Sequence, residues 1–214
     1  MNQAAIIRIM LVDDHAIVRA GFRRLLEQRP DFRVVAEAAD AERAYALFVE
    51  QQPDVVVMDL SMPGVSGLDT IRRIVARQPA ARILVFSMHE DASVAERAIQ
   101  LGARGYVTKS NAPEVLAAAV AEVVAGRLAL SPDMANAIAM LKLTGEGNPL
   151  QALSPREFEI FRLIASGRPA AEIARMLNLS AKTIANYHTL IKQKLNIGTD
   201  VELVLLAQRH NVVL

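Results

Sequence analysis

The chain has 214 residues, 52% of them hydrophobic, so it offers length for two domains and a core in each, and a wholly disordered chain is excluded. It contains no cysteine, which excludes a small disulfide-linked secreted scaffold and a thiolate metal site. The formal net charge of +1 by itself indicates neither a strongly basic nucleic-acid binder nor an acidic tail protein.

Short apolar runs alternate with helical patterns over the first 125 residues. The runs mostly lack polar alternation, which is typical of parallel strands buried on both faces. We expect strands at 6–12, 34–36, 55–58, 83–86 and 106–107. We expect helices at 16–28, 41–51, 66–78, 92–102 and 113–125. This order predicts an α/β domain over residues 1–125, built on a doubly wound five-stranded parallel sheet with helices on both faces.

The remaining residues show no further strand pattern. We expect a linker over 126–152, with one short helix at 133–143 and flexible turn material at 145–149. Residues 153–214 are helical in pattern and predict a small all-α domain with helices at 155–166, 170–177, 181–195 and 200–210. Ser154 with Glu157 and Thr199 with Glu202 have the spacing of capping boxes, which explains Glu157 without a functional role.

The apolar runs of the sequence do not indicate a membrane protein. The first twelve residues are broken by Arg8 and run into Asp13, and no apolar run reaches the roughly 18 residues that a membrane span needs. We therefore expect a cytoplasmic protein without membrane insertion.

Acidic residues follow two of the predicted strands. Asp13 and Asp14 follow the first strand and Asp59 the third, and in a parallel sheet these ends meet at one edge. Crowded carboxylates without clustered His or Cys favour a hard divalent ion, Mg²⁺ before Zn²⁺. Ser87 and Lys109 follow neighbouring strands and offer a hydroxyl and a positive charge. Each Asp taken alone is equally well explained as a turn or cap residue.

The residues on this edge carry a family resemblance. The segments Leu11–His15, Val57–Gly64, Phe86–Ser87 and Gly105–Lys109 resemble the ordered motifs of a two-component receiver domain with the flavodoxin-like fold. The resemblance implies that Asp59 accepts phosphate from a sensor histidine kinase, and that Asp13, Asp14, Asp59 and the Ser61 carbonyl hold Mg²⁺. It also implies that Lys109 neutralises the phosphoryl group. Ser87 and Tyr106 would then form a switch pair, and the alternative for Tyr106 is a plain core aromatic residue, which is compatible with that role. Many receivers have proline after the lysine, where this chain has Ser110.

The C-terminal helices carry the local positive charge. Residues 173–199 contain four basic residues and no acid. Within the helix at 181–195, apolar positions recur on one face, and polar side chains able to reach phosphates or base edges lie on the other. The candidate DNA contacts are Lys182, Thr183, Asn186, Thr189, Lys192 and Gln193.

Segments of this half resemble the LuxR-type helix-turn-helix, namely Leu153–Glu157, Glu172–Ala174, Leu179–Ile184 and Lys194–Leu195. Together the two halves resemble a response regulator of the NarL/FixJ type. The resemblance implies a phosphorylation-dependent transcription regulator and not an enzyme. Since one recognition helix reads only a few base pairs, we expect a homodimer on paired half-sites after phosphorylation. Val201, Leu205 and Gln208 share one face of the last helix and are the candidate dimer contacts.

Two other functions remain in competition. A phosphatase that forms an aspartyl phosphate usually has a second acid two residues after the nucleophile, where this chain has Ser61. An adaptor whose helical module binds protein would show no salt-dependent binding to DNA.

Overall fold

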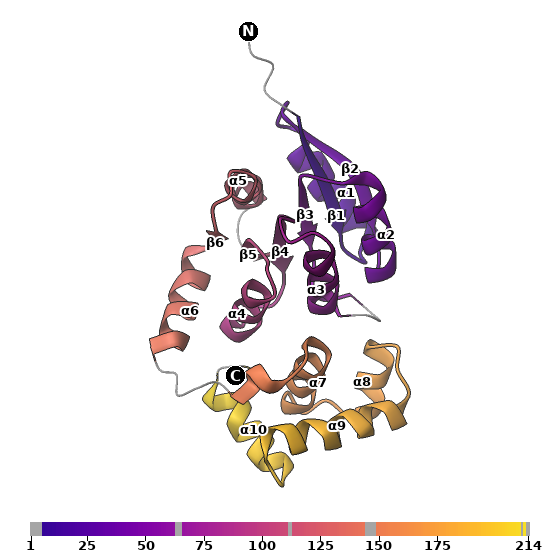
Figure 1. Ribbon diagram of the computed structural model, residues 1–214, viewed down its shortest axis with the longest axis vertical. Coiled ribbons are helices and arrows are strands. Elements are labelled where there is room, and N and C mark those ends of the chain that lie inside the picture. The colour runs from indigo at the N-terminus through magenta and orange to yellow at the C-terminus, as the bar shows by residue number, and fades with distance from the viewer. Residues whose placement is uncertain (1–5, 63–65, 111–112, 144–148, 211, 213–214) are drawn as a thin grey trace.

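A computed structural model describes residues 6–62, 66–110, 113–143, 149–210 and 212 of the protein. Its N-terminal part alternates strands with helices, as the sequence predicts (Figure 1). The elements are β1 (Ile7–Val12), α1 (Ala16–Leu26), β2 (Phe32–Ala38), α2 (Ala41–Gln51), β3 (Val55–Met58), α3 (Gly67–Arg77), β4 (Ile83–Ser87), α4 (Ala92–Gln100), β5 (Gly105–Thr108) and α5 (Pro113–Val124).

The strands form one parallel sheet in the order β2-β1-β3-β4-β5-β6. The predicted doubly wound α/β fold is confirmed, and β6 (Ala129–Leu130) extends it within the segment expected to be a linker. This edge strand lies so close to β5 that a Cβ atom at Gly105 would be only 2.6 Å from the Ala129 carbonyl oxygen. Glycine at position 105 therefore permits the pairing. A strand of two residues leaves no periodic signal, which is why the sequence did not predict it.

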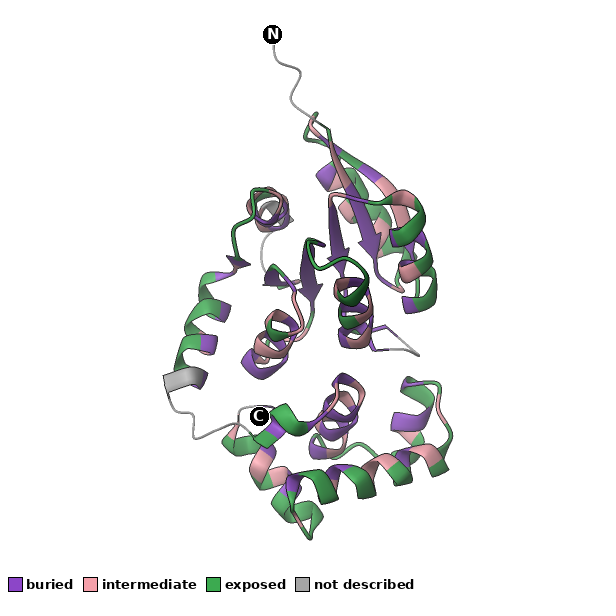
Figure 2. Ribbon diagram, viewed as in Figure 1, coloured by how far each residue is buried: buried purple, intermediate pink, exposed green. Residues whose placement is uncertain are grey.

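The sheet is buried on both faces (Figure 2). Alternate residues of β1 contribute to different layers, with Ile9 and Leu11 in the layer of α1 and α5, and Met10 and Val12 in the layer of α2, α3 and α4. The second layer continues without a break into the C-terminal helices, where Phe158 belongs to the same apolar cluster. The two halves of the chain therefore pack against each other through apolar side chains.

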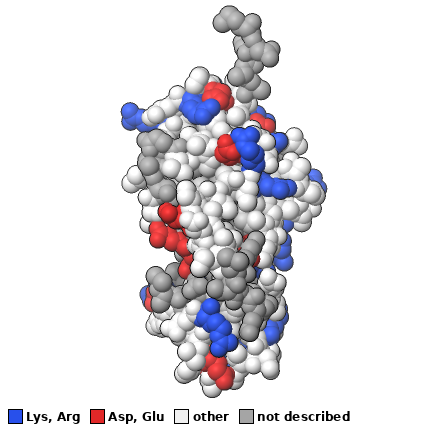
Figure 3. All heavy atoms as spheres, turned by 90° about the vertical axis from the view of Figure 1, so that its left-hand side faces the viewer, with Lys and Arg blue, Asp and Glu red and all other residues white. Residues whose placement is uncertain are grey.

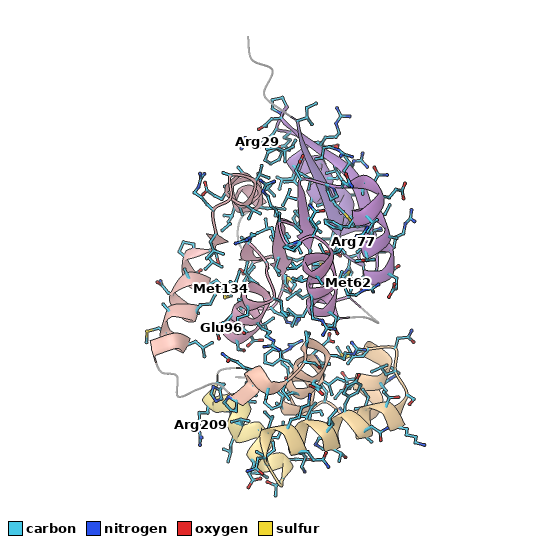
Figure 4. The ribbon with its side chains drawn as sticks, viewed as in Figure 1. Arg29, Met62, Arg77, Glu96, Met134 and Arg209 are labelled. Atoms are coloured by element: carbon cyan, nitrogen blue, oxygen red, sulfur yellow. The ribbon has the colours of Figure 1, made fainter. Side chains whose placement is uncertain are left out.

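Helix α6 (Pro132–Leu143) occupies the position predicted for a short helix between the two halves. It packs along α4 through the buried side chains Met134 and Ile138, and Met134 is labelled in Figure 4. The face of the molecule on this side shows mostly uncharged side chains, with charged ones in small groups (Figure 3). Residues 144–148 lie outside the described part of the chain, so the expected flexible region is described only at Pro149, which begins the 3-10 turn η1 (Pro149–Ala152).

The C-terminal helices are α7 (Pro155–Ala165), α8 (Ala170–Met176), α9 (Ala181–Leu195) and α10 (Asp200–Arg209). Both predicted capping boxes are present, one joining Ser154 with Glu157 and the other Thr199 with Glu202. The side chain of Ser180 accepts a hydrogen bond from the Thr183 backbone and so begins α9. Among the described residues, no helix combines the length and apolar character needed to cross a membrane.

The two halves meet at the end of the sheet where the strands finish. Helix α7 lies next to this edge, while α9 runs along the far side of the helical half (Figure 1). Met62, labelled in Figure 4, lies at this end and helps to line a cavity shared with α7 and α8. The N-terminal half thus covers α7 and leaves the outer face of α9 exposed.

Candidate functional site

The carboxyl ends of three strands bring two carboxylates and one ammonium group into contact. Asp13 follows β1, Asp59 follows β3 and Lys109 follows β5. The Lys109 Nζ atom donates to Asp13 Oδ2 at 2.5 Å and to Asp59 Oδ2 at 2.7 Å. The three side chains are only 10%, 8% and 3% exposed for Lys109, Asp13 and Asp59, so these charges interact with little screening by water.

The protonation of Lys109 depends on these two bonds. Burial favours the neutral amine and by itself lowers the pKa of Lys109, but the hydrogen bonds to Asp13 and Asp59 outweigh it, so the pKa is raised above its ordinary value. The side chain therefore remains a fixed positive charge beside Asp59 at neutral pH.

Backbone amides hold the other oxygen of each carboxylate. Asp13 Oδ1 accepts from the His15 amide at 2.7 Å, and Asp59 Oδ1 accepts from the Ser61 amide at 3.1 Å. The start of α3 packs tightly behind Asp59, since a Cβ at Gly67 would lie 3.0 Å from the Asp59 carbonyl oxygen. Asp59 is consequently fixed in position before any ligand arrives.

The donor set fits a hard divalent cation. The ligand atoms of Asp13, Asp14 and His15 lie within 4.8 Å of one another. Asp14 Oδ1 is shielded from solvent and receives no hydrogen bond of good geometry within the described chain, although it lies 2.8 Å from His15 Nδ1. A shielded carboxylate oxygen without a donor is suited to a metal. The sequence did not predict His15 in this group.

Ser87 and Tyr106 lie behind the acidic site and both are fully buried. The Tyr106 hydroxyl donates to the His89 carbonyl oxygen at 2.8 Å, and burial raises the pKa of Tyr106 well above its ordinary value. The His89 amide donates to Ser87 Oγ at 3.4 Å. The Lys109–Ser110 peptide, next to this group, is trans. His89 thus connects the two residues predicted to form a switch pair.

A cavity of about 270 Å³ separates this edge from α7 and α8. Asp14, Ser61 and His89 line it from the sheet side, and Phe158 and Arg162 line it from α7. The Arg162 guanidinium lies 3.2 Å from His89 Nε2 and 3.4 Å from Nδ1. Burial and the charge of Arg162 lower the pKa of His89 to about 4, so the ring is neutral at pH 7.

The predicted DNA contacts all lie on α9, but they differ in solvent exposure and in their contacts with neighbouring side chains. Lys182, Asn186, Thr189 and Gln193 are exposed. Thr183 is partly buried, and its hydroxyl lies 2.8 Å from Ser180 Oγ. Lys192 donates to Asp200 Oδ1 at 3.0 Å at the start of α10, so it is already paired within the helical half.

The predicted pairing face of α10 is also exposed. Val201 and Leu205 are 68% and 54% exposed, and Gln208 is exposed one turn beyond Leu205. The three positions follow one stripe of the helix. This geometry leaves the stripe accessible to a second molecule.

Comparison with known proteins identifies the family of both halves. Residues 9–121 match the response regulator receiver domain, and residues 151–207 match the bacterial regulatory proteins of the luxR family. The chain belongs to the NarL/FixJ-type response regulators. The receiver and LuxR-type resemblances noted from the sequence are thereby confirmed.

Similar response regulators cover nearly the whole chain. Transcriptional activator protein ExaE of Pseudomonas putida is 40% identical over 93% of this chain and 94% of its own length. Response regulator UvrY of Escherichia coli K12 is 38% identical over 96% of this chain and 95% of its own length.

Solved structures give the same relationship. RcsB of Salmonella enterica serovar Typhimurium, solved bound to promoter P1flhDC with the phosphomimetic BeF3⁻, is 30% identical and covers 97% of this response regulator and 99% of its own chain, with a TM-score of 0.67. A LuxR-family two-component response regulator from Aurantimonas sp. SI85-9A1 is 52% identical. The match covers 65% of this chain and 99% of that chain, with a TM-score of 0.63.

Sequence reasoning missed the residues that connect the two halves of this response regulator. His89 and Arg162 are 73 positions apart. Neither residue lies in the segments that carry the receiver or helix-turn-helix resemblance. Glu157 was explained by its cap, yet the buried carboxylate also accepts from Lys194 Nζ at 2.7 Å. Only the packing of distant segments reveals such contacts.

Proposed function

We propose that this response regulator is a phosphorylation-dependent transcription regulator in which Asp59 accepts a phosphoryl group from a sensor histidine kinase. The observation that carries the proposal is the fixed, buried Asp59 carboxylate held between Lys109 Nζ and the Ser61 amide. A carboxylate oxygen of Asp59 attacks phosphorus, the bond from phosphorus to the histidine nitrogen breaks, and the imidazole leaves. The added charge lies beside Lys109, which is already positioned to neutralise it.

Asp13, Asp14, Asp59 and the Ser61 carbonyl would hold Mg²⁺, which neutralises negative charge on the transferring phosphoryl oxygens. The shielded Asp14 Oδ1 supports this assignment, because it lacks a hydrogen-bond donor of good geometry among the described residues. The phosphoryl group ends on the protein's own Asp59, so we assign no substrate turnover. Ser61 takes the place where a phosphatase would have a second, proton-donating acid.

The output of the proposed regulator is DNA binding through α9. The exposed Lys182, Asn186, Thr189 and Gln193 form the outer face, and the partly buried Thr183 and Lys192 border it. The exposed stripe of Val201, Leu205 and Gln208 would pair two DNA-bound copies through α10. The resemblance to RcsB, solved on promoter DNA, supports this proposal. With a histidine kinase and DNA as its proposed partners, the regulator would act in the cytoplasm.

Phosphorylation of Asp59 is tested directly by incubating the full chain with acetyl phosphate and Mg²⁺. We expect one phosphoryl group per chain, located by peptide mass mapping on Asp59. Asp59→Asn should abolish it, whereas Asp133→Asn, which changes an exposed acid in the first turn of α6, should leave it unchanged. Full labelling of Asp59→Asn would overturn the proposal.

A further inference from the structure

His89 lies where the phosphorylation site meets the rest of the molecule. It is in the short segment between β4 and α4, two residues beyond Ser87. Its amide donates to Ser87 Oγ at 3.4 Å, its carbonyl accepts from the Tyr106 hydroxyl at 2.8 Å, and its Nε2 lies 3.2 Å from Ser61 Oγ. Any displacement of Ser87 or Tyr106 therefore acts on His89.

The His89 ring also contacts the DNA-binding half. Arg162 of α7 places its two terminal guanidinium nitrogens 3.2 Å and 3.4 Å from the ring nitrogens. A guanidinium only donates hydrogen bonds, so the contact needs a ring nitrogen without a proton. Within the described chain, no carboxylate lies within 4.0 Å of the Arg162 guanidinium nitrogens. His89 is thus the hydrogen-bond partner of the Arg162 side chain in this part of the chain.

Other contacts show that α7 is held by the segment around α4. Arg97 of α4 donates to the Leu153 carbonyl oxygen, just before α7 begins. Val94 of α4 and Phe158 of α7 line the same cavity and belong to one apolar cluster. Apolar packing therefore holds the two halves together beside the bond from Arg162 to His89. Only the latter is made by the segment that Ser87 and Tyr106 both contact through hydrogen bonds.

We propose that His89 and Arg162 form an interdomain latch that reports the position of the Ser87–Tyr106 pair to helix α7. This inference rests on the proposed function of Asp59. When the Ser87 hydroxyl turns toward a phosphoryl group on Asp59, its bond to the His89 amide changes, the ring leaves Arg162, and α7 separates from the receiver. His89 is a positioning residue in this scheme, since it acts through Arg162 and touches no DNA.

The latch is tested by measuring the opening between the two halves of the full chain. The protein has no cysteine, so Gln28→Cys just after α1 and Ala171→Cys in α8, both exposed, accept a single pair of spin labels. Arg162→Gln and His89→Ala should each raise the ratio of open to closed molecules about tenfold without phosphorylation, which corresponds to about 1.4 kcal/mol. Arg24→Gln, which removes an exposed arginine from α1, should leave the distances unchanged.

Three further outcomes decide the proposal. The double variant should open no more than either single variant, because both changes remove one contact; additive effects would contradict a direct latch. His89→Gln should recover part of the closed population, since its amide oxygen also accepts from Arg162. An unchanged distance distribution in both single variants would overturn the latch. Failure of the parent chain to be phosphorylated would overturn only the proposed function, because these comparisons use unphosphorylated protein.

Discussion

At the scale of single residues, the acidic site depends on Lys109. Two carboxylates and one ammonium group meet in a region that is almost closed to water. Two buried carboxylates repel each other, and the ammonium group of Lys109, bonded to both, offsets that repulsion. Lys109 therefore stabilises the receiver before it has any part in phosphoryl transfer.

Removing that cation should destabilise the receiver. We expect Lys109→Ala to lower the free energy of unfolding by about 3–5 kcal/mol, the usual effect of breaking a buried ion pair from one side. Urea titration of the full chain, followed by fluorescence of a label on the receiver, measures it. Adding Asp59→Asn should recover part of the loss, since one buried charge disappears, and Mg²⁺ should stabilise Lys109→Ala more than the parent. Equal unfolding of Lys109→Ala and Arg24→Ala would contradict this view.

At the scale of elements, one buried carboxylate joins α7 to α9. Glu157 closes the capping box of α7 and accepts from Lys194 in the last turn of α9. Burial by itself raises the pKa of Glu157, but the bonds from Lys194 and Ser154 outweigh it and the pKa is lowered. A single side chain thus joins the start of one helix to the end of another.

The lowered pKa gives this pair a pH dependence of known sign. A carboxyl group whose pKa is lower in the folded state stabilises the fold above its unfolded pKa of about 4.3, and this contribution is lost as the pH falls through the lowered value. We expect Glu157→Gln to lower the melting temperature of the helical half at pH 7. Below about pH 4, the melting temperature of the variant should fall less steeply with falling pH than that of the parent. Calorimetry from pH 3 to pH 7 tests this, with Glu96→Gln in α4 as the control. An unchanged acid slope would show that Glu157 is not coupled to folding.

The exposed face of α9 predicts two different effects on DNA binding. If Lys182 contacts the phosphate backbone, as proposed, Lys182→Ala should weaken binding to all sequences and lower the slope of affinity against salt by about one unit. Asn186 suits an adenine edge, so Asn186→Ala should instead relax the choice of sequence. Titrations of the full chain at several salt concentrations with matched and altered operators separate the two. Identical behaviour of both variants would show that this face does not read bases.

At the scale of the whole molecule, the strand and helix pattern was predictable because the alternation of buried runs and capped helices is local. The acidic edge was predictable as well, because the order of strands and helices implies a parallel sheet, and such a sheet brings the carboxyl ends of its strands to one edge. The position of α7 against that edge was not predictable. It depends on Phe158 and Val94 lining one cavity and on the contact of Arg162 with His89, and no local pattern predicts such pairings between residues so far apart.

This arrangement changes how phosphorylation is expected to act. The receiver covers α7, while the outer face of α9 and the stripe on α10 remain exposed. We expect the unphosphorylated receiver to hinder pairing of two copies, and this exposure means that the hindrance does not come from covering the DNA-reading face. We expect it to come from fixing the orientation of one half against the other, which would affect two copies on paired half-sites far more than one copy on a single half-site.

Two kinds of operator distinguish these mechanisms. On a duplex with one half-site, the fragment 150–214 and the unphosphorylated full chain should bind with similar affinity, because α9 is equally accessible in both. On a duplex with two half-sites, the unphosphorylated chain should bind more weakly than the phosphorylated chain by about 5–150-fold, the ordinary range of coupling between two sites. Circular dichroism of the fragment controls for its folding. If the unphosphorylated chain already bound one half-site much more weakly than the folded fragment, the receiver would be blocking α9 itself, and control by orientation would be wrong.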